Sequence, residues 1–363
     1  MLSFKNNTFK IMQIADTQEG KKVSPDTLDL INAALKREKP DLVVYSGDQI
    51  WGKTSFKGDK RKVTAVLDTL TKPVRDRKIP FTICFGNHDR QVGLTNEEQF
   101  EIYKDFDYFI GENTDGIDGV ANHVIEIKDG DELKFLLYLI DSHSSLKVGY
   151  DCVHENQIEW YKKTRDAYEQ KYGRLIPSVV IQHIPVCEIF ELLTEVKKGT
   201  KGAVRGFRTH ANRFYILNKD KVNQNGFMKE SPADPQENSG EFSAFKEKGE
   251  VIGVYFGHDH NNSFNGKVDG IDLGYTQGAG FHVYGPGKDR GVRIIELKKN
   301  GTLNTYDLRF RDIVGNKVKE PFKYAMFQIM PTNMFDAVTR LIKFFIGVGI
   351  VAVIAILLTF FLG

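Results

Sequence analysis

The stretch PFTICFGNHD, at residues 80–89, decides the fold, because a short apolar run passes directly into a polar turn. The run from Phe81 to Phe85 has the length and the β-branched and aromatic content of a buried strand. Residues 41–48, DLVVYSGD, follow the same design earlier in the chain. Each strand is therefore expected to end near a glycine that is followed by oxygen- or nitrogen-bearing side chains.

Helices are predicted on both sides of the 41–48 strand. Residues 10–15 form an earlier apolar strand, and a helix begins after it, since Ser24 is a good N-cap and Pro25 suits the first helical position. A second helix is predicted over 60–77. Strands that alternate with helices in this way pair in parallel through right-handed crossovers.

The rest of the chain continues this mixture of helices and strands. Its patterns predict elements at 96–106, 123–128, 133–140, 155–172, 177–182 and 251–256, and short strands in the glycine-rich residues 263–310. We predict an α/β (α+β) fold, a four-layer αββα sandwich of two mixed β-sheets flanked by helices. One domain is expected over 1–310, with a polar surface insertion or lid over 199–240.

Composition excludes several classes of protein. The chain has 363 residues and a net charge of only +2, and its basic residues are scattered among acidic ones. No nucleic-acid partner is expected from such a charge distribution. The three cysteines are widely spaced, which argues against a disulfide scaffold or a zinc ribbon. Cys84 is predicted to be part of a strand core.

The residues before the end of the chain differ from the rest. Phe344 to Leu362 carries no charge and has the ~20-residue length of a membrane-spanning helix. We expect a transmembrane tail anchor at 344–362 and a stem over 311–343; a buried core helix is the alternative. Arg340 and Lys343 precede the apolar run, and the N-terminus lacks a signal-peptide core, so the expected localisation is single-pass in a membrane with the domain in the cytosol.

Polar side chains follow several of the predicted strands. Strand ends in one sheet lie ~5 Å apart, and ligands of open α/β sheets bind at carboxyl ends. Carboxylate and amide oxygens mixed with imidazoles suit Mn, Fe or Zn rather than a thiolate site. Two such metal ions can share a hydroxide that attacks a phosphate ester in line. The candidate ligands are Asp16, Asp48, Asn87, His183, His258 and His260.

Each motif has an ordinary explanation when it is taken alone. Residues 87–89 could be a simple turn, and His183 could be a hydrogen-bonded histidine at a strand end. All the candidate ligands follow predicted strands, and they occur in a fixed order along the chain. Together these features favour a single shared metal site over a simple turn or an isolated histidine. The remaining histidines without a motif are predicted to be structural or at the surface: His123, His143, His154 and His210.

The order D…GD…GNHD…H…GHDH resembles the calcineurin-like metallophosphoesterase superfamily. The similarity is greatest to small purple-acid-phosphatase-like proteins of plants and fungi, some labelled "probable inactive purple acid phosphatase". It extends over residues 9–308 and includes GY at 149–150, QIEW at 157–160, HIP at 183–185 and GHDHNNSF at 257–264.

The resemblance implies a role for each matching residue. Asp48 would bridge two metal ions. His88 would stabilise the transition state or protonate the leaving oxygen, and Asp89 would orient its ring. The first ion would be held by Asp16 and His260, and the second by Asn87, His183 and His258.

Two departures from the family pattern bear on the expected chemistry. Gln18 stands where the family usually has histidine, and an amide oxygen is a poorer ligand than imidazole for Fe or Zn. The first ion would then be weakly held, replaced by Mn or Mg, or missing. Trp51 stands where purple acid phosphatases have a tyrosine ligand, so a purple ferric site is not expected.

Three functions are consistent with these residues. The first is a metal-dependent phosphomonoesterase that acts on a small phosphate ester or a phosphoprotein, with Arg90 and His282 as candidate substrate contacts. The second is a catalytically impaired scaffold in which Gln18 weakens the first metal site. The third is a phosphodiesterase, which lacks the support of a basic, aromatic-lined groove.

Overall fold

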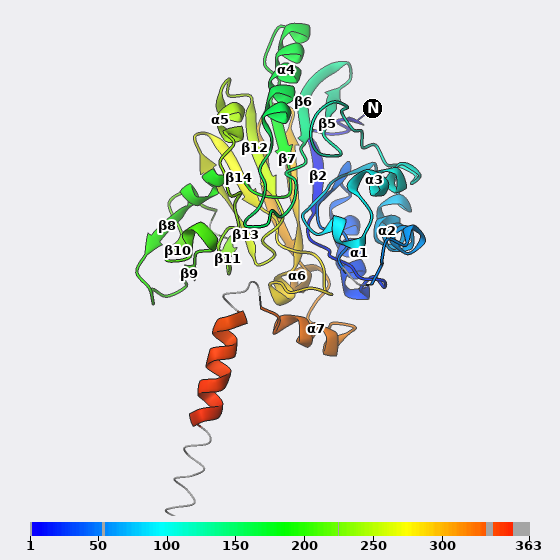
Figure 1. Ribbon diagram of the computed structural model, residues 1–363. Coiled ribbons are helices and arrows are strands. Elements are labelled where there is room, and N and C mark those ends of the chain that lie inside the picture. Colours follow the sequence, from blue (N-terminus) through cyan, green and yellow to red (C-terminus); the bar gives the residue numbers. More distant parts are fainter. Residues whose placement is uncertain (1, 53–54, 224, 332–336, 351–363) are drawn as a thin grey trace, which may run out of the picture.

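A five-stranded sheet contains the strands predicted from the first ninety residues. The computed structural model describes residues 2–52, 55–223, 225–331 and 337–350 (Figure 1). The strand order is β16-β15-β2-β3-β4, in which β2, β3 and β4 are parallel and β15 and β16 run antiparallel at one edge. The bounds are β2 Thr8–Ile14, β3 Leu42–Ser46, β4 Phe81–Cys84, β15 Gly291–Lys298 and β16 Leu303–Arg309.

An eight-stranded sheet packs against the first. Its order is β1-β5-β6-β7-β12-β14-β13-β11, with parallel pairing from β6 through β7 and β12 to β14. The bounds are β1 Leu2–Ser3, β5 His123–Asp129, β6 Glu132–Leu139, β7 Ser178–Ile181, β11 Phe227–Met228, β12 Val251–Phe256, β13 Asn262–Val268 and β14 Ile271–Tyr275.

Helices cover the outer faces of both sheets, so the predicted four-layer sandwich is confirmed (Figure 1). Three of them pack on the five-stranded sheet, and two pack on the eight-stranded sheet. The first group is α1 Pro25–Glu38, α2 Lys60–Arg75 and α3 Asn96–Lys104; the second is α4 Glu155–Tyr172 and α5 Glu241–Lys246. Short 3₁₀ helices lie at Asp89–Val92, Cys187–Leu192, Arg208–His210 and Gly287–Asp289.

The parallel strands are apolar on both faces because both faces are buried. In β3, Leu42 and Val44 join the core between the two sheets, while Val43 and Tyr45 join the core beneath the helices. This explains the continuous apolar runs of the sequence, as expected for parallel strands covered on both sides. Cys84 lies in the inter-sheet core, as predicted.

The polar segment 199–240 contributes two strands, β9 and β10, to a small sheet that also includes β8, which precedes the segment. β8 Leu193–Val196, β9 Val204–Arg205 and β10 Phe214–Leu217 form a three-stranded antiparallel sheet beside the main body (Figure 1). After β16, helices α6 Phe310–Ile313 and α7 Pro321–Gln328 follow. The backbone N–H of Lys319 donates to Oδ1 of Asp26 over 2.7 Å, so this part of the predicted stem packs on the domain.

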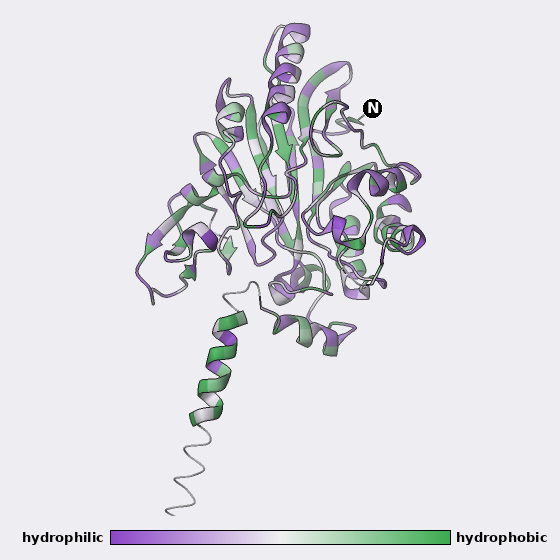
Figure 2. Cartoon of the chain, viewed as in Figure 1, coloured by the Kyte–Doolittle hydropathy of each residue, from purple (hydrophilic) through white to green (hydrophobic). Residues whose placement is uncertain are grey.

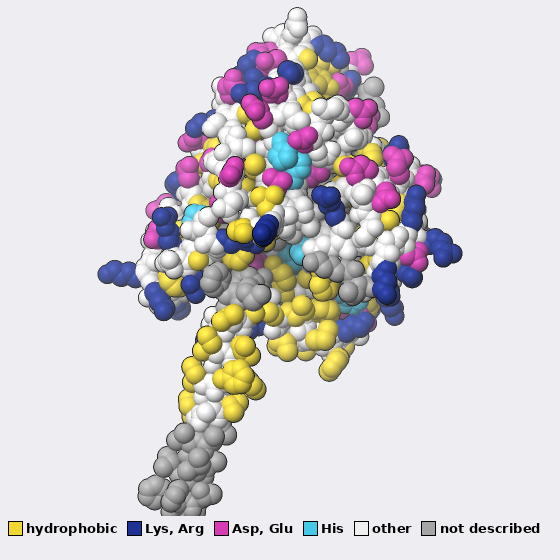
Figure 3. Space-filling model, viewed as in Figure 1, with side chains coloured by type: hydrophobic (Ala, Val, Ile, Leu, Met, Phe, Trp, Pro, Cys, Tyr) yellow, Lys and Arg dark blue, Asp and Glu magenta, His cyan; other side chains and the backbone are white. Residues whose placement is uncertain are grey.

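The predicted transmembrane helix requires a correction. None of the helices in the described part of the chain combines the length and the apolar character needed to span a bilayer. The described helix over 337–350 projects from the body and is largely apolar (Figures 2 and 3). Residues 351–362 lie outside the described residues. The tail anchor, its membrane partner and the tail-anchored localisation are therefore withdrawn.

Candidate metal centre

The predicted ligands come together where the parallel strands of both sheets end. Asp16 follows β2, Asp48 follows β3 and His183 follows β7. Nε2 of His183 lies 3.4 Å from Oδ2 of Asp48 and 3.2 Å from Oδ1 of Asn87. Nε2 of His260 lies 3.4 Å from Oδ1 of Asp16, and one ligand atom each from Asp16, Asp48 and His260 falls within 4.8 Å of the others.

Two main-chain carbonyls fix how two of the histidines face this centre. Nδ1 of His183 lies 2.9 Å from the carbonyl oxygen of Ser46, and Nδ1 of His260 lies 3.0 Å from that of Tyr284. A carbonyl oxygen only accepts, so each neutral ring carries its proton on Nδ1 and leaves the lone pair on Nε2. Both lone pairs point toward the carboxylates, as in histidines that bind metal ions.

Two buried atoms of the centre have no hydrogen-bond partner among the described residues: Oδ1 of Asp16 and Nε2 of His258. A buried acceptor without a partner is costly, and buried carboxylates require positive charge nearby. Both atoms belong to the predicted ligands. The donor set, two carboxylates with an amide and three imidazoles, therefore fits two divalent ions.

The electrostatics of the centre also call for positive charge. Burial opposes the ionisation of Asp48, but His183 and His88 together hold the pKa of Asp48 below its usual range. Burial alone would lower the pKa of His183, and the Asp48 charge instead raises it to about 10. The carboxylates thus stabilise a cation at the point where Nε2 of His183 meets them.

Tight turns carry the carboxylates into place. Asp16 and Asp48 adopt left-handed backbone conformations with φ of 51° and 56°, as residues at functional sites often do. A Cβ on Gly47 would lie 2.4 Å from Nδ1 of His183, and a Cβ on Gly86 would lie 2.2 Å from Oδ1 of Asp48. Glycine before each polar group is required because only it permits this close approach.

Asp89 has a different position from the one expected. Its carboxylate accepts the backbone N–H groups of Gly86, Asp48 and Gln49 over 2.8 Å each, and that of Ile50 over 3.2 Å. Nδ1 of His88 has no hydrogen-bond partner in the described chain, so the expected bond from Asp89 to the ring is missing there. Asp89 fixes the turn that presents Asp48.

His88 lies at the edge of the centre rather than inside it. Its Nε2 is 4.0 Å from Oδ2 of Asp48, and its side chain is 31% exposed. Its backbone N–H donates to Oδ1 of Asp48 over 2.7 Å. The ring therefore faces solvent-accessible space beside the predicted ligands.

Gln18 contacts the two residues that flank the first predicted metal position. Its Nε2 donates to Oδ2 of Asp48 over 2.8 Å and lies 3.2 Å from Nε2 of His260. The amide is thus within reach of that position. Its NH₂ group makes the contact with Asp48 that a cation would otherwise make.

Of the two predicted substrate contacts, His282 has ion-pair partners that fix its position, whereas Arg90 stays a prediction. Arg90 is exposed. His282 is paired with Glu320 over 2.7 Å and with Glu19 over 3.4 Å, so it connects the segment before α7 to the domain instead of facing the ligands.

Tyr150 is a site residue that the sequence reasoning did not single out. Its ring packs edge-to-face on His258, with centroids 4.4 Å apart. The guanidinium of Arg208 lies 5.2 Å from the centroid of the Tyr150 ring. Only the GY pair at 149–150 in the family resemblance pointed to it. A cavity of about 200 Å³ at the centre is lined by Tyr150, His88 and His258, with Trp51, Phe207 and Tyr284.

Comparison with known proteins identifies the family. The model of the family described as calcineurin-like phosphoesterase matches residues 9–262. The chain belongs to the calcineurin-like phosphoesterase family. A relative in Arabidopsis thaliana named "Probable inactive purple acid phosphatase 14" is 30% identical over 336 residues, covering 81% of this chain and 76% of the relative. Phosphatase DCR2 of Saccharomyces cerevisiae is 28% identical, covering 80% of this chain and 52% of that protein.

A solved structure shares the fold of this calcineurin-like phosphoesterase. It is a dimetal phosphatase from Danio rerio, with a TM-score of 0.50 and 12% identity, covering 83% of this chain and 99% of that one. The sandwich that surrounds the candidate centre is therefore the fold of a dimetal phosphoesterase. The superfamily and the purple-acid-phosphatase-like branch inferred from the motifs are both confirmed.

Proposed function

We propose that the chain is a metal-dependent phosphomonoesterase. The observation that carries this proposal is the meeting of Asp16, Asp48, Asn87, His183, His258 and His260 at one edge of the sandwich, with buried acceptor atoms left unpaired. The substrate class is a phosphate ester of a small molecule or a phosphoprotein. The catalytic domain would be 1–310, with 199–240 as an insertion beside the cavity.

The ligand roles are those of the family pattern. Asp48 would bridge two ions, Asp16 and His260 would hold the first, and Asn87, His183 and His258 would hold the second. When bound, Mn, Fe or Zn ions would activate a water molecule and neutralise charge on the phosphoryl oxygens. The left-handed turns at Asp16 and Asp48 keep the carboxylates preorganised for this task.

His88 is the proposed general acid. It is not aimed at a ligand position, its side chain is part-exposed, and it lies beside Asp48, where a leaving oxygen would depart. An imidazole can act as a general acid near neutral pH. The small cavity lined by Tyr150 and Trp51 favours a compact phosphorylated group over a long chain.

Activity of the full chain after metal loading tests this proposal. Protein that has been stripped with a chelator and reloaded with Mn²⁺ should hydrolyse p-nitrophenyl phosphate, and Asp48→Asn should lower kcat/KM by at least ~100-fold. Asp131→Asn, on the exposed turn between β5 and β6, is the matched control and should leave the rate unchanged. Equal rates in the wild type and Asp48→Asn would rule out this site. If bis(p-nitrophenyl) phosphate is hydrolysed faster than p-nitrophenyl phosphate, the phosphodiesterase function is favoured instead.

A second function is favoured by Gln18. Its amide already satisfies Oδ2 of Asp48, so the first ion would compete with a hydrogen bond inside the protein. Relatives of this chain carry the name "Probable inactive purple acid phosphatase". A catalytically impaired member would hold fewer than two ions at the candidate centre and show no turnover with any divalent ion. Metal content measured together with turnover separates the two functions.

A further inference from the structure

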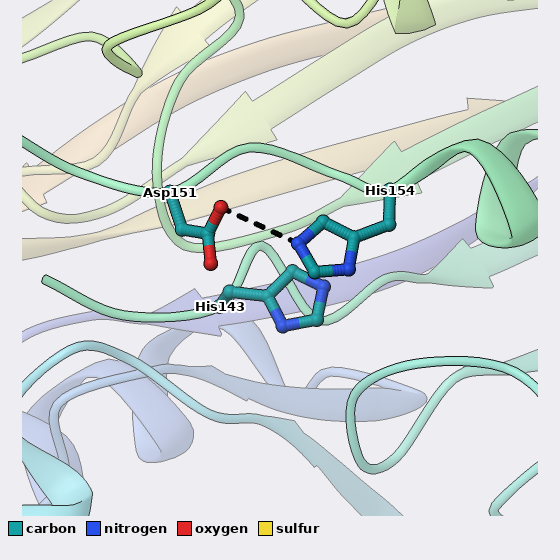
Figure 4. Close-up of side chains that lie close together, drawn as sticks. All are labelled: His143, Asp151 and His154. Carbon is teal, nitrogen blue, oxygen red and sulfur yellow. Dashed lines mark hydrogen bonds and ion pairs between the residues drawn. The ribbon is translucent and has the colours of Figure 1, made fainter. Parts of the chain in front are cut away.

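A second group of metal-binding side chains lies outside the candidate centre. His143, Asp151 and His154 each offer one ligand atom, and these atoms lie within 4.8 Å of one another (Figure 4). All three are half-buried, and they flank the loop 144–150. Histidine side chains with acidic neighbours reach the surface on this face of the molecule (Figure 3). An ion at this position would be open to solvent on one side.

Hydrogen bonds fix the tautomer of His143. The Nε2 amide group of Gln157 donates to Oδ1 of Asn122 and to the carbonyl of Asp141, over 3.0 and 2.8 Å. Its Oε1 therefore accepts, and it lies 2.7 Å from Nε2 of His143. His143 must donate from Nε2, so the lone pair of the neutral ring is on Nδ1. This is the state in which an imidazole binds a metal ion.

A carboxylate fixes the tautomer of His154 in the same way. Nδ1 of His154 lies 2.6 Å from Oδ2 of Asp118, so it donates its proton there. Its Nε2 then faces Oδ1 of Asp151 over 3.3 Å, with an acceptor on each side. Two facing acceptors attract a proton or a metal ion between them. The order Asp118–His154–ion would reproduce the carboxylate–histidine–metal arrangement found in many zinc sites.

The two imidazole rings are also unusually close. They stack with centroids 3.9 Å apart and an interplanar angle of 19°. His143 adopts a left-handed backbone with φ of 63°, a strained state for a residue with a side chain. The stacking keeps both rings next to Asp151, with one possible ligand atom of each of the three residues within 4.8 Å of the others.

We propose that His143, Asp151 and His154 form a further metal site that takes a divalent transition ion such as Zn²⁺. Two imidazoles and one carboxylate are a common set of three protein ligands for Zn²⁺, with a water molecule in the fourth position. The site is independent of the proposed phosphoesterase activity. It uses none of the ligands of the candidate centre.

The loop that this ion would close touches the candidate centre at two points. Oγ of Ser144 donates to the carbonyl oxygen of Asn87 over 3.2 Å. Tyr150 packs on His258 with centroids 4.4 Å apart. An ion that joins His143 to Asp151 and His154 would tie both ends of loop 144–150, and so hold Ser144 and Tyr150 against the centre.

Zinc titration of the full chain tests the site. Protein stripped by a chelator is titrated with Zn²⁺ and the bound ions are counted. Asp151→Asn and His154→Asn should each bind one ion fewer per chain than the wild type. Asp118→Asn should leave the number of bound ions unchanged but lower the affinity of this site for Zn²⁺ by ~10–100-fold. His210→Asn is the matched control, because His210 is also half-buried and near an acid, Asp234, at 3.7 Å.

A local readout separates this site from the candidate centre. Lys147 is exposed in the loop, so trypsin cleavage after it reports on how well the loop is held. Zn²⁺ should slow this cleavage in the wild type and leave it unchanged in Asp151→Asn. If Asp151→Asn and His154→Asn bind as many zinc ions as the wild type with unchanged affinity, the proposal is wrong. Equal zinc protection of Lys147 in Asp151→Asn would also overturn it.

Discussion

Gln18 donates a hydrogen bond from Nε2 to Oδ2 of Asp48 over 2.8 Å, and the same nitrogen lies 3.2 Å from Nε2 of His260. The contact joins the turn after β2 to the turn after β3 at the point where the first ion would bind. The neutral amide of Gln18 therefore stabilises the buried carboxylate of Asp48 at a position where a cation would otherwise bind, because its N–H group donates a hydrogen bond to one carboxylate oxygen.

Gln18→His should restore a ligand and strengthen the first metal site at least about tenfold. Gln18→Leu is the matched control, since it removes the hydrogen bond without offering a ligand. Metal content and kcat/KM of both variants measure the effect. A gain in ions and rate for histidine alone is the expected result. Equal values for the two variants would mean that position 18 does not limit the first site.

His88→Asn should lower kcat by ~10²–10⁴-fold while the number of bound ions stays the same. The reason is that His88 lies beside the ligands, 4.0 Å from Oδ2 of Asp48, and is proposed to act on the leaving group. Steady-state rates with p-nitrophenyl phosphate and metal analysis on the same sample provide the measurement. Loss of an ion in this variant would instead make His88 a ligand.

Gly47→Ala should destabilise the fold and weaken metal binding, because its Cβ would lie 2.4 Å from Nδ1 of His183. Gly270→Ala is the matched control: its φ of +90° is close to the +98° of Gly47, but nothing lies within 4 Å of its Cβ. Backbone strain of ~1–2 kcal/mol is common to both. Urea denaturation should show a larger loss for Gly47→Ala, and equal losses would contradict the packing argument.

The stability of the fold should fall as pH rises through the range set by Glu241. Burial raises the pKa of Glu241 to about 8, although Gln182 donates to it. The unfolded chain releases this proton near pH 4.5, while the folded chain keeps it up to about pH 8. Between these values the free energy of unfolding should decrease by up to ~1.4 kcal/mol per pH unit from this group.

Glu241→Gln should remove that part of the pH dependence and be the more stable form at pH 8. Urea denaturation at pH 5, 6, 7 and 8 measures both proteins. Glu97→Gln, at an exposed position in α3, should leave the curve unchanged. Identical pH profiles for the wild type and Glu241→Gln would show that Glu241 ionises freely in the folded chain.

Local sequence was sufficient for most of the layered fold. Apolar runs such as 42–46 and 81–84 form buried parallel strands, and Ser24 with Pro25 begins α1, because these choices depend on neighbours in the chain. The apolar run at 344–362 shows the limit of the same reasoning. Composition alone predicted a spanning helix, and the described helices do not provide one.

The sequence by itself determined which residues could meet at the candidate centre, because Gly47-Asp48 and residues 86–89 follow strands whose parallel pairing puts their ends side by side. Only the tertiary structure decided what Gln18, Asp89 and His282 contact. Their partners are set by side chains from segments distant in sequence or by how a turn closes. The stacking of His143 on His154 has the same origin: no motif relates the two residues, and the loop between them brings their rings together.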